Sequence, residues 1–588
     1  MIFDPGRRIS IATLGVFALL LLPGCATGPD TSDYPVTEHA RPFQSLSDAA
    51  GSAPAVAERV TFRRILNARD EPQNWLTYFG AYDGQRYSEL DEINRENIKN
   101  LRPAWVFQFG QIGLAATPAT YAFEAAPIVV DGVMYVTGWD GYLWALNAET
   151  GQEYWRYKHP VPLDTPLCCG NVNRGAAVAK GKVFMASPNG HLVALDARNG
   201  DVVWQKVFAD IRAGESATIA PLVVKNLVIV GSSGAEYGIR GHIDAFDIDT
   251  GERVWRRYTV PKPGESGSET WPEDSDAWAR GGGSAWITAT YDPELDLMYW
   301  GTGNPSPDFD GSVRRGDNLY TSSVIAIDPD DGAMRWHYQW TPHDLWDYDG
   351  NNENILFDLN GRKLLAHFDK NGYLFILDRT NGEFVRVVPF ANPTWGDIDA
   401  AGNITVKKTP TPGGEVICPG PAGGKEWNHA AYNPRTELLY APVIDGCATF
   451  TLEPGEFRES LPYWGGNVDI GKHPQRGHLK AFNPATGEEV WSWDNDAPMV
   501  ASVLTTAGDL VFTGEPTGEF NAYDARTGEL LWQFNTGSGI HSNPVTYSVN
   551  GKQYIAVPSG WGGWVKGFAP DMLGAPRGDA LFVFSLPE

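Results

Sequence analysis

A short pattern ending in tryptophan recurs along the 588-residue chain. The copy that ends at Trp155 reads ALNAETGQEYW, and the next reads ALDARNGDVVW. One partial copy and one copy with arginine at the last position are included among the eight copies, which end at Trp105, Trp155, Trp204, Trp255, Trp336, Arg386, Trp491 and Trp532. Many copies lie about fifty residues apart, which is the spacing of propeller blades.

Each copy combines an alternating apolar strand with a turn of the pattern D-x-x-T-G. Glycine permits a positive φ in such a turn, and Asp or Asn can bond the turn backbone. One small antiparallel sheet cannot bury both of its faces, whereas sheets stacked radially cover one another. The sequence therefore predicts an all-β fold, an eight-bladed β-propeller, with the repeated tryptophans packed between adjacent blades.

Two long insertions interrupt the repeat, between Trp255 and Trp336 and between Arg386 and Trp491. Both are rich in glycine, proline and polar residues, so we expect loops on one face of the ring. Sites on propellers are usually built from such loops. The segment ALFVFSL near the C-terminus is expected to close the ring against an early strand.

The N-terminus has the features of an export signal. Arg7 and Arg8 precede the apolar run ISIATLGVFALLLL, which is short for a membrane-spanning helix and typical of a signal h-region. The run ends at LPGC, which is similar to a bacterial lipoprotein box with Cys25 as the acylated residue. We therefore expect a signal peptide over 1–25, a linker over 26–70 and the propeller over 71–588. The expected location is the periplasm, with a lipid anchor at Cys25.

The net charge of −26 argues against a nucleic-acid partner, because phosphate binding needs Lys and Arg. It suits either plain solubility or the attraction of a basic protein partner. Four cysteines remain besides Cys25, and an even number in an oxidising compartment suggests two disulfides, with three pairings possible. No C-x-x-C-H motif for covalent haem attachment occurs.

Several segments outside the repeat carry a resemblance to a known family. In order they are CCGNVNRG, GSSGAEYGIRG, GGGSAWITATYDPELDLMYWGTGNPSPD, GDNLYTSSVIAID and TPHDLWDYDG. From about Asn74 to the C-terminus, the chain resembles the quinoprotein alcohol dehydrogenases, periplasmic enzymes that use pyrroloquinoline quinone (PQQ) and a metal ion. The resemblance implies oxidation of small primary alcohols to aldehydes, with electrons passed to a separate acceptor such as a cytochrome c.

The resemblance also implies a set of cofactor-binding residues. Cys168 and Cys169 would form a vicinal disulfide against one face of the quinone, and Trp286 would stack on the other face. Arg174 would supply positive charge for the carboxylates of the cofactor, and Lys370 would lie near a quinone oxygen. The remaining expected contacts are Glu124, Thr218, Ser233, Gly234, Ala235, Trp427 and Trp564.

Two further features belong to the same resemblance. Cys418 and Cys447 lie in the arrangement of the family's second disulfide. Glu426 departs from the family, because relatives commonly have asparagine before the tryptophan at 427.

The metal site is expected from hard oxygen donors. Glu236 and Asn304 match metal ligands, and Asp347 matches a ligand that also acts as the catalytic base. Asp349 adds a carboxylate where calcium-dependent members usually have a small residue. Oxygen donors suit calcium-like ions, and the extra charge favours a lanthanide, with calcium as the alternative.

A second class of function is compatible with the repeat alone. Non-catalytic propeller lipoproteins that act as scaffolds in outer-membrane assembly carry similar repeats and a similar anchor. A scaffold needs blades but no adjacent cysteines and no acidic constellation, and fold alone does not decide function.

Overall fold

A computed structural model describes residues 52–110, 123–162, 165, 167–471, 473–562 and 576–588. The chain divides into residues 1–43 and 44–588, and all described residues belong to the second part. The expected signal peptide with Cys25 lies outside the described residues, and so does Trp564. Within the described ranges, no helix is long and apolar enough to cross a membrane.

The described residues contain eight sheets of four or five strands, which is also the number of repeat copies. Five of these sheets each take four consecutive strands. They are β3 (Ile128–Val130), β4 (Val133–Thr137), β5 (Tyr142–Asn147), β6 (Glu153–Lys158); β7 (Ala177–Ala179), β8 (Lys182–Ser187), β9 (His191–Asp196), β10 (Val202–Val207); β11 (Leu222–Val224), β12 (Leu227–Gly231), β13 (His242–Asp247), β14 (Arg253–Tyr258); β15 (Thr290–Asp292), β16 (Leu297–Thr302), β17 (Ser323–Ile327), β18 (Met334–Gln339); and β19 (Ile355–Leu359), β20 (Arg362–Phe368), β21 (Tyr373–Asp378), β22 (Glu383–Pro389).

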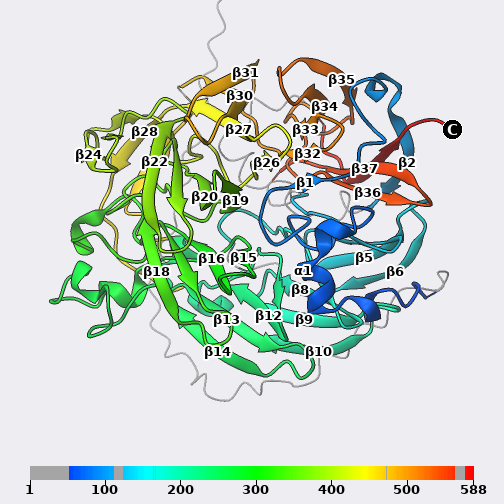
Figure 1. Ribbon diagram of the computed structural model, residues 1–588. Helices are drawn as coiled ribbons and strands as arrows, with labels where there is room; N and C mark the ends of the chain where they lie inside the picture. Colours follow the sequence, from blue (N-terminus) through cyan, green and yellow to red (C-terminus); the bar gives the residue numbers. More distant parts are fainter. Residues whose placement is uncertain (1–51, 111–122, 163–164, 166, 472, 563–575) are drawn as a thin grey trace, which may run out of the picture. The chain divides into compact units, whose positions relative to one another are not determined.

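The other three large sheets combine strands that are further apart in sequence. They are β26 (Ala431–Asn433), β27 (Leu438–Gly446), β30 (Gln475–Phe482), β31 (Glu489–Asn495); β1 (Tyr87–Ser88), β32 (Leu504–Thr506), β33 (Leu510–Gly514), β34 (Glu519–Asp524), β35 (Leu530–Asn535); and β2 (Arg102–Gln108), β38 (Ala580–Ser585), β37 (Lys552–Ser559), β36 (Val545–Val549). Figure 1 shows the sheets following one another around a central axis, so the β-propeller predicted from the repeat is confirmed.

The first and last strands of the ring share one sheet. Strand β2 pairs antiparallel with β38, and the register places Trp105 opposite Val583. The expected closure of the ring by the C-terminal strand is therefore confirmed. Closure also removes two unpaired sheet edges that would otherwise invite aggregation.

The repeated tryptophans pack against the turn glycines of the next copy. A Cβ atom on Gly200 would lie 2.6 Å from the Trp155 ring, and one on Gly251 would lie 2.7 Å from the Trp204 ring. The same close approach joins Gly151 to Trp105, Gly332 to Trp255, Gly382 to Trp336 and Gly528 to Trp491. These glycines also have positive φ, so both space and backbone conformation exclude a side chain.

The indole nitrogens extend this contact. The Trp155 Nε1 donates to the Ala197 carbonyl at 3.1 Å, and Trp204 donates to Ile248 at 3.1 Å. Where arginine replaces tryptophan, the Arg386 guanidinium donates instead to the carbonyls of Ala485 and Thr486, at 2.8 Å each. The expected packing between neighbouring sheets is confirmed, and the exceptional copy keeps it, because a Cβ atom on Gly487 would lie 3.1 Å from Arg386 Cδ.

A short helical segment precedes the first sheet. Its elements are η2 (Ala57–Arg59), α1 (Phe62–Leu66) and η3 (Ala68–Asp70), and the side chains of Val60 and Ile65 are buried in the main core. Residues 57–70 lie in the range predicted as a linker, yet they pack on the sheets because these apolar side chains are covered there. The remaining short helices are η4 (Ile98–Asn100), η6 (Ile211–Ala213), η7 (Ala235–Tyr237), η8 (Ser268–Thr270), η9 (Ala277–Arg280) and η10 (Gly311–Val313).

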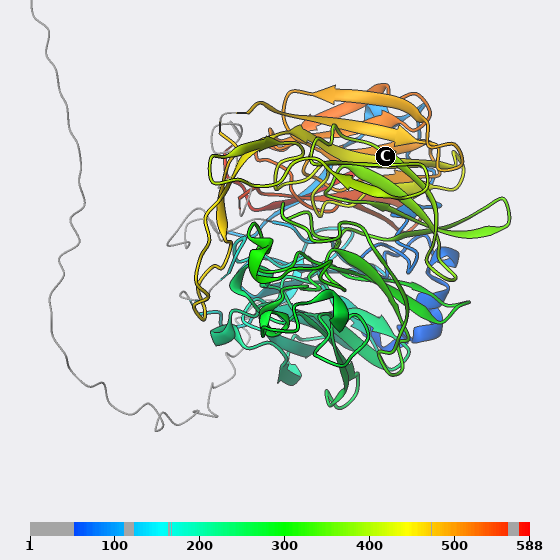
Figure 2. The same ribbon diagram turned by 90° about the vertical axis from the view of Figure 1, so that its left-hand side faces the viewer.

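The second long insertion forms two small sheets of its own. They are β23 (Gly396–Ile398) with β24 (Ile404–Val406), and β25 (Glu415–Ile417) with β28 (Ala448–Leu452) and β29 (Gly466–Asp469). Figure 2 shows the yellow segment with β28 and β29 on one face of the ring and α1 on the opposite face. The candidate site lies among such loops.

Candidate active site

A cavity of about 500 Å³ gathers residues from loops that are far apart in sequence. Twelve of the residues singled out from the sequence line it: Cys168, Cys169, Arg174, Thr218, Ser233, Gly234, Glu236, Trp286, Asp347, Asp349, Lys370 and Trp427. Three others lie outside the lining: Glu124, Ala235 and Asn304. All three are buried, with Ala235 completely inaccessible.

The adjacent cysteines Cys168 and Cys169 lie side by side in the cavity without a disulfide bond between them. Their Sγ atoms are 2.6 Å apart, whereas a disulfide requires about 2.05 Å. The structure therefore does not contain the vicinal disulfide that the resemblance implies. Among the described residues, Cys168, Cys169 and Glu236 form the one group of three Cys, His or acidic side chains whose ligand atoms all lie within 4.8 Å of one another.

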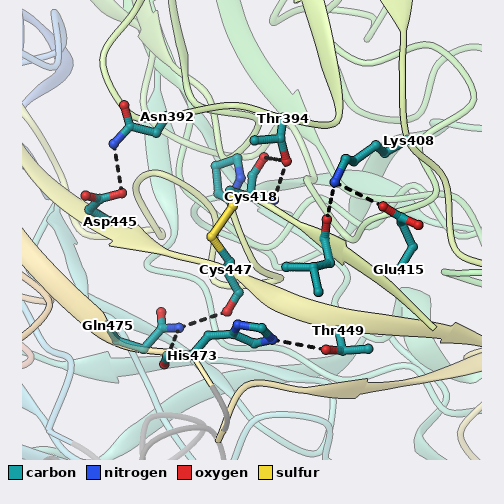
Figure 3. The surroundings of a disulfide bond; sticks show 12 residues. Asn392, Thr394, Lys408, Glu415, Cys418, Asp445, Cys447, Thr449, His473 and Gln475 are labelled. Atoms are coloured by element: carbon teal, nitrogen blue, oxygen red, sulfur yellow. Dashed lines mark hydrogen bonds and ion pairs between the residues drawn. A yellow bond between two sulfur atoms is a disulfide. The ribbon is translucent and has the colours of Figure 1, made fainter.

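The second pair of cysteines does form a disulfide. Cys418 and Cys447 are joined at 2.04 Å, as Figure 3 shows. The Cys418 backbone N–H donates to the Thr394 hydroxyl at 2.9 Å, and the Gln475 side chain donates to the Cys447 carbonyl at 2.9 Å. The implied pairing is confirmed, and it links two loops of the second insertion.

The loop that carries Asp347 and Asp349 is folded around the carboxylate of Asp344. This buried carboxylate accepts the backbone N–H groups of Trp346 at 2.9 Å, Tyr348 at 2.9 Å and Asp349 at 3.1 Å. Both Asp347 and Asp349 have left-handed backbones, with φ of 63° and 54°. The many hydrogen bonds to one carboxylate hold a conformation that such residues otherwise rarely adopt.

One ammonium group faces three carboxylates in the cavity. The Lys370 Nζ lies 3.0 Å from Asp349, 3.4 Å from Asp347 and 3.8 Å from Glu426. Burial raises the pKa of the Asp347 carboxyl well above its usual range; Lys370 opposes this shift, and the charges of Asp349 and Glu236 add to it. Negative charge in this part of the cavity exceeds positive charge, which favours a bound cation.

Asn304 offers an oxygen to such a cation. Its backbone N–H donates to Asp349 Oδ1 at 3.0 Å, and its side-chain Nδ2 donates to Asp308 Oδ1 at 2.9 Å. Its Oδ1 is buried and has no hydrogen-bond partner within the described part of the chain. A buried acceptor left over beside carboxylates fits a hard metal ion such as calcium or a lanthanide.

Arg174 is held rigidly between two indole rings. Its guanidinium carbon lies 4.7 Å from the ring centroid of Trp286 and 4.6 Å from that of Trp427. It also pairs with Glu124 at 3.0 Å and donates to the Thr218 hydroxyl at 2.6 Å. Burial raises the pKa of the Glu124 carboxyl to about 7, and the Arg174 charge opposes this shift. A flat aromatic wall beside a fixed cation fits a planar, multiply charged anion such as PQQ.

A buried charged network lies behind the Trp427 side of the cavity. Glu353 accepts hydrogen bonds from Lys425 Nζ at 2.9 Å, from the His429 ring at 3.2 Å and from the Ala430 backbone at 2.7 Å. The other ring nitrogen of His429 lies 2.8 Å from the Tyr78 hydroxyl. This network fixes the segment that presents Glu426 and Trp427.

The sequence reasoning missed several lining residues. Asp308 lies in the quoted segment GTGNPSPD, but nothing in the repeat pattern singles it out. Phe309 and Trp464 lie side by side, because the Phe309 N–H donates to the Trp464 carbonyl at 2.8 Å. An odd acid within a glycine- and proline-rich stretch was the only available signal for Asp308.

Comparison with known proteins agrees with this site. The family model described as PQQ: glucose/ethanol/alcohol dehydrogenase, β-propeller domain, matches residues 75–392 and 495–555. The quinoprotein alcohol dehydrogenase PedH of Pseudomonas putida is 39% identical over 576 residues, covering 92% of this chain and 95% of the relative. The lanthanide-dependent methanol dehydrogenase of Methylacidiphilum fumariolicum is 38% identical over 545 residues, covering 85% of this chain and 87% of the relative.

A solved structure extends the similarity to three dimensions. The quinohemoprotein alcohol dehydrogenase from Comamonas testosteroni superposes with a TM-score of 0.84 at 36% identity, covering 91% of this chain and 84% of that one. These similarities extend over nearly the whole ring, and the scaffold alternative is not favoured. The chain therefore belongs to the PQQ-dependent alcohol dehydrogenases with a β-propeller domain, and it is an alcohol-oxidising quinoprotein.

Proposed function

We propose that the protein oxidises primary alcohols to aldehydes in the periplasm and passes the electrons to a separate acceptor such as a cytochrome c. The observation that carries this proposal is the cavity itself. Asp347 lies there beside buried carboxylates and Lys370, in the same cavity as Arg174 and Trp286. This combination supplies a proton acceptor, a cation site and a binding wall for a planar cofactor.

The residues divide into two binding groups. Trp286, Trp427 and Arg174 would hold PQQ, together with the cavity donors Thr218, Ser233, Gly234 and Lys370. Glu236, Asn304, Asp347 and Asp349 would hold the metal ion. When bound, PQQ supplies the acceptor for the hydride lost from the carbinol carbon, and the metal ion supplies Lewis-acid polarisation.

Asp347 is the proposed general base. Its carboxylate would accept the hydroxyl proton of the alcohol as the C–O bond becomes a carbonyl. Lys370, at 3.4 Å, holds the carboxylate in place and opposes the rise of its pKa on burial. The apolar side chains of Leu167, Phe309 and Val468 line the same cavity and would exclude water around the carbinol carbon.

We favour a lanthanide as the metal ion, with calcium as the alternative. Asp349 adds a carboxylate to Glu236 and Asp347, and a more highly charged cation gains more from it. One relative is a lanthanide-dependent methanol dehydrogenase, and a similar solved structure is a europium-containing methanol dehydrogenase, at 36% identity and a TM-score of 0.82.

The proposed location and electron acceptor are supported by features of the sequence. The apolar run after Arg8 supports export, and Cys25 is the proposed lipid anchor. No C-x-x-C-H motif occurs in the sequence, which supports the proposal of a separate electron acceptor. A net charge of −26 would attract a basic redox protein.

A matrix of metals and alcohols tests the proposal. The purified protein is supplied with PQQ and either lanthanum or calcium, and dye reduction is measured with a series of primary alcohols. We expect turnover that requires both PQQ and a metal ion. Absence of turnover with every combination would contradict the proposal and would favour a scaffold function.

A further inference from the structure

Asp308 fixes the orientation of the Asn304 amide. Asn304 Nδ2 lies 2.9 Å from Asp308 Oδ1 and 3.4 Å from the Pro305 carbonyl, which can only accept, so the end of the amide that faces Asp308 is the NH2 group. The opposite end of the amide, Oδ1, is then left without a partner in the described part of the chain. Asp308 thereby decides which end of Asn304 a metal ion would meet.

Asp308 is itself held by a buried arginine. Arg314 is completely inaccessible to solvent, and its guanidinium donates to the carbonyls of Pro307 at 2.9 Å and Asp308 at 3.1 Å. Another donor contact runs to Asn318 Oδ1 at 2.9 Å. Such planar, multiple contacts require the geometry of a guanidinium.

The same arginine reaches the loop of the proposed base. Arg314 Nη2 donates to the Asp344 carbonyl at 2.5 Å, and the Asp344 carboxylate folds the loop that carries Asp347 and Asp349. One guanidinium thus ties the Asn304–Asp308 segment to the Asp344–Asp349 loop. Arg314 therefore holds the two segments that would supply metal ligands in one position relative to each other.

We infer that Asp308 is a positioning residue for the metal site: anchored by Arg314, it turns the Asn304 amide so that Oδ1 faces the cation. This inference rests on the proposed function, because it presupposes a metal ion at Asn304. Groups that orient metal ligands from outside typically contribute ten- to a hundredfold to metal affinity.

A pair of variants with the same charge separates positioning from electrostatics. The side chains of Asp308→Asn and Asp308→Leu are both uncharged, but only asparagine keeps an oxygen that can accept from Asn304 Nδ2. Lanthanum binding to each protein is measured calorimetrically in the presence of PQQ. We expect Asp308→Leu to bind lanthanum about tenfold or more weakly than Asp308→Asn.

Two further variants serve as a repeat of the test and as its control. Asp308→Ala repeats the loss of the acceptor with a smaller side chain, in case leucine prevents folding. Asp310→Asn is the matched control, because Asp310 is a buried acid of the same segment whose carboxylate accepts from the Ser312 N–H and does not line the cavity. Its lanthanum affinity should equal that of the unaltered protein.

The possible outcomes are distinct. Equal lanthanum affinity for Asp308→Asn, Asp308→Leu and Asp308→Ala would overturn the inference, since charge or direct ligation would then explain the role of Asp308. Failure of the unaltered protein to bind either lanthanum or calcium with PQQ would overturn the proposed function, and this inference with it.

Discussion

The contacts between the sheets are repeated, whereas the contacts that shape the cavity each occur once. Trp155 against Gly200 and Trp204 against Gly251 are copies of one arrangement. The Asp344 carboxylate accepts from backbone N–H groups two, four and five residues ahead, whereas the repeat-turn carboxylates of Asp247 and Asp524 accept from those two and three residues ahead. A ring built from copies tolerates single loops of any sequence, so chemistry can be added without disturbing the framework.

The largest expected effect is a loss of turnover without a loss of stability when Asp347 is replaced. Asp347→Asn should lower kcat by about a hundred- to ten-thousandfold, which is the usual contribution of a general base. The unfolding temperature should stay unchanged, because the Asp347 side chain is partly exposed and its contact is one ion pair with Lys370. Steady-state kinetics and thermal unfolding measure the two effects.

Asp330→Asn is the control for this variant, since Asp330 is an exposed acid in a repeat turn that pairs with Lys225. It should leave kcat unchanged. A loss of activity in Asp347→Asn that is matched by a loss of folded protein would remove the separation between the two regions.

The next largest effect should be a loss of stability without a loss of turnover, when a tryptophan between two sheets is replaced. Trp155 is 1% exposed and packs on Gly200, so Trp155→Ala should lower the free energy of unfolding by about 3–5 kcal/mol. The kcat of the folded fraction should be unchanged. Urea unfolding followed by fluorescence measures the loss, and Trp464→Ala, at a position 46% exposed, should cost far less.

The framework could be predicted from sequence because its physics is local and repeated. Each D-x-x-T-G turn contains the glycine, and each copy ends with the tryptophan that packs on the turn of the next copy. Arg386 could not be explained in advance, because its partners are carbonyls of Ala485 and Thr486, about a hundred residues away.

The site was predicted by resemblance, and its supporting residues were not. Asp347 and Asn304 match a family residue by residue, whereas Asp308 and Arg314 act through hydrogen bonds to Asn304 and to the Asp344 carbonyl that only the folded loops reveal. Neither the repeat nor the spacing of residues predicts which carboxylate accepts a hydrogen bond from which amide.

A smaller effect concerns the choice of metal ion. Asp349→Ala should lower lanthanum-supported turnover about tenfold more than calcium-supported turnover, because a triply charged ion loses more Coulomb energy with each ligand charge. Turnover with each metal, at saturating PQQ, gives the ratio. Equal losses with both metals would remove the argument for a lanthanide.

A pH effect tests whether the buried network behind Trp427 also contributes to stability, through His429. Burial lowers the pKa of this imidazole to about 4; the charge of Glu353 opposes the shift, and those of Arg86 and Lys425 add to it. In the unfolded chain a histidine titrates near 6.5, so between pH 6.5 and 4 the unfolded state binds a proton that the folded state does not. The free energy of unfolding is therefore fully retained above pH 6.5 and falls as the pH decreases, by about 2 kcal/mol from this group at pH 5.

Glu353, whose pKa is lowered to about 2, loses its contribution to stability only below pH 4.5 and does not interfere between pH 8 and 5. Unfolding midpoints measured from pH 8 to 5 should fall less steeply for His429→Gln than for the unaltered protein. Parallel pH curves would show that the buried network behind Trp427 takes no part in acid stability, and that the framework alone sets it.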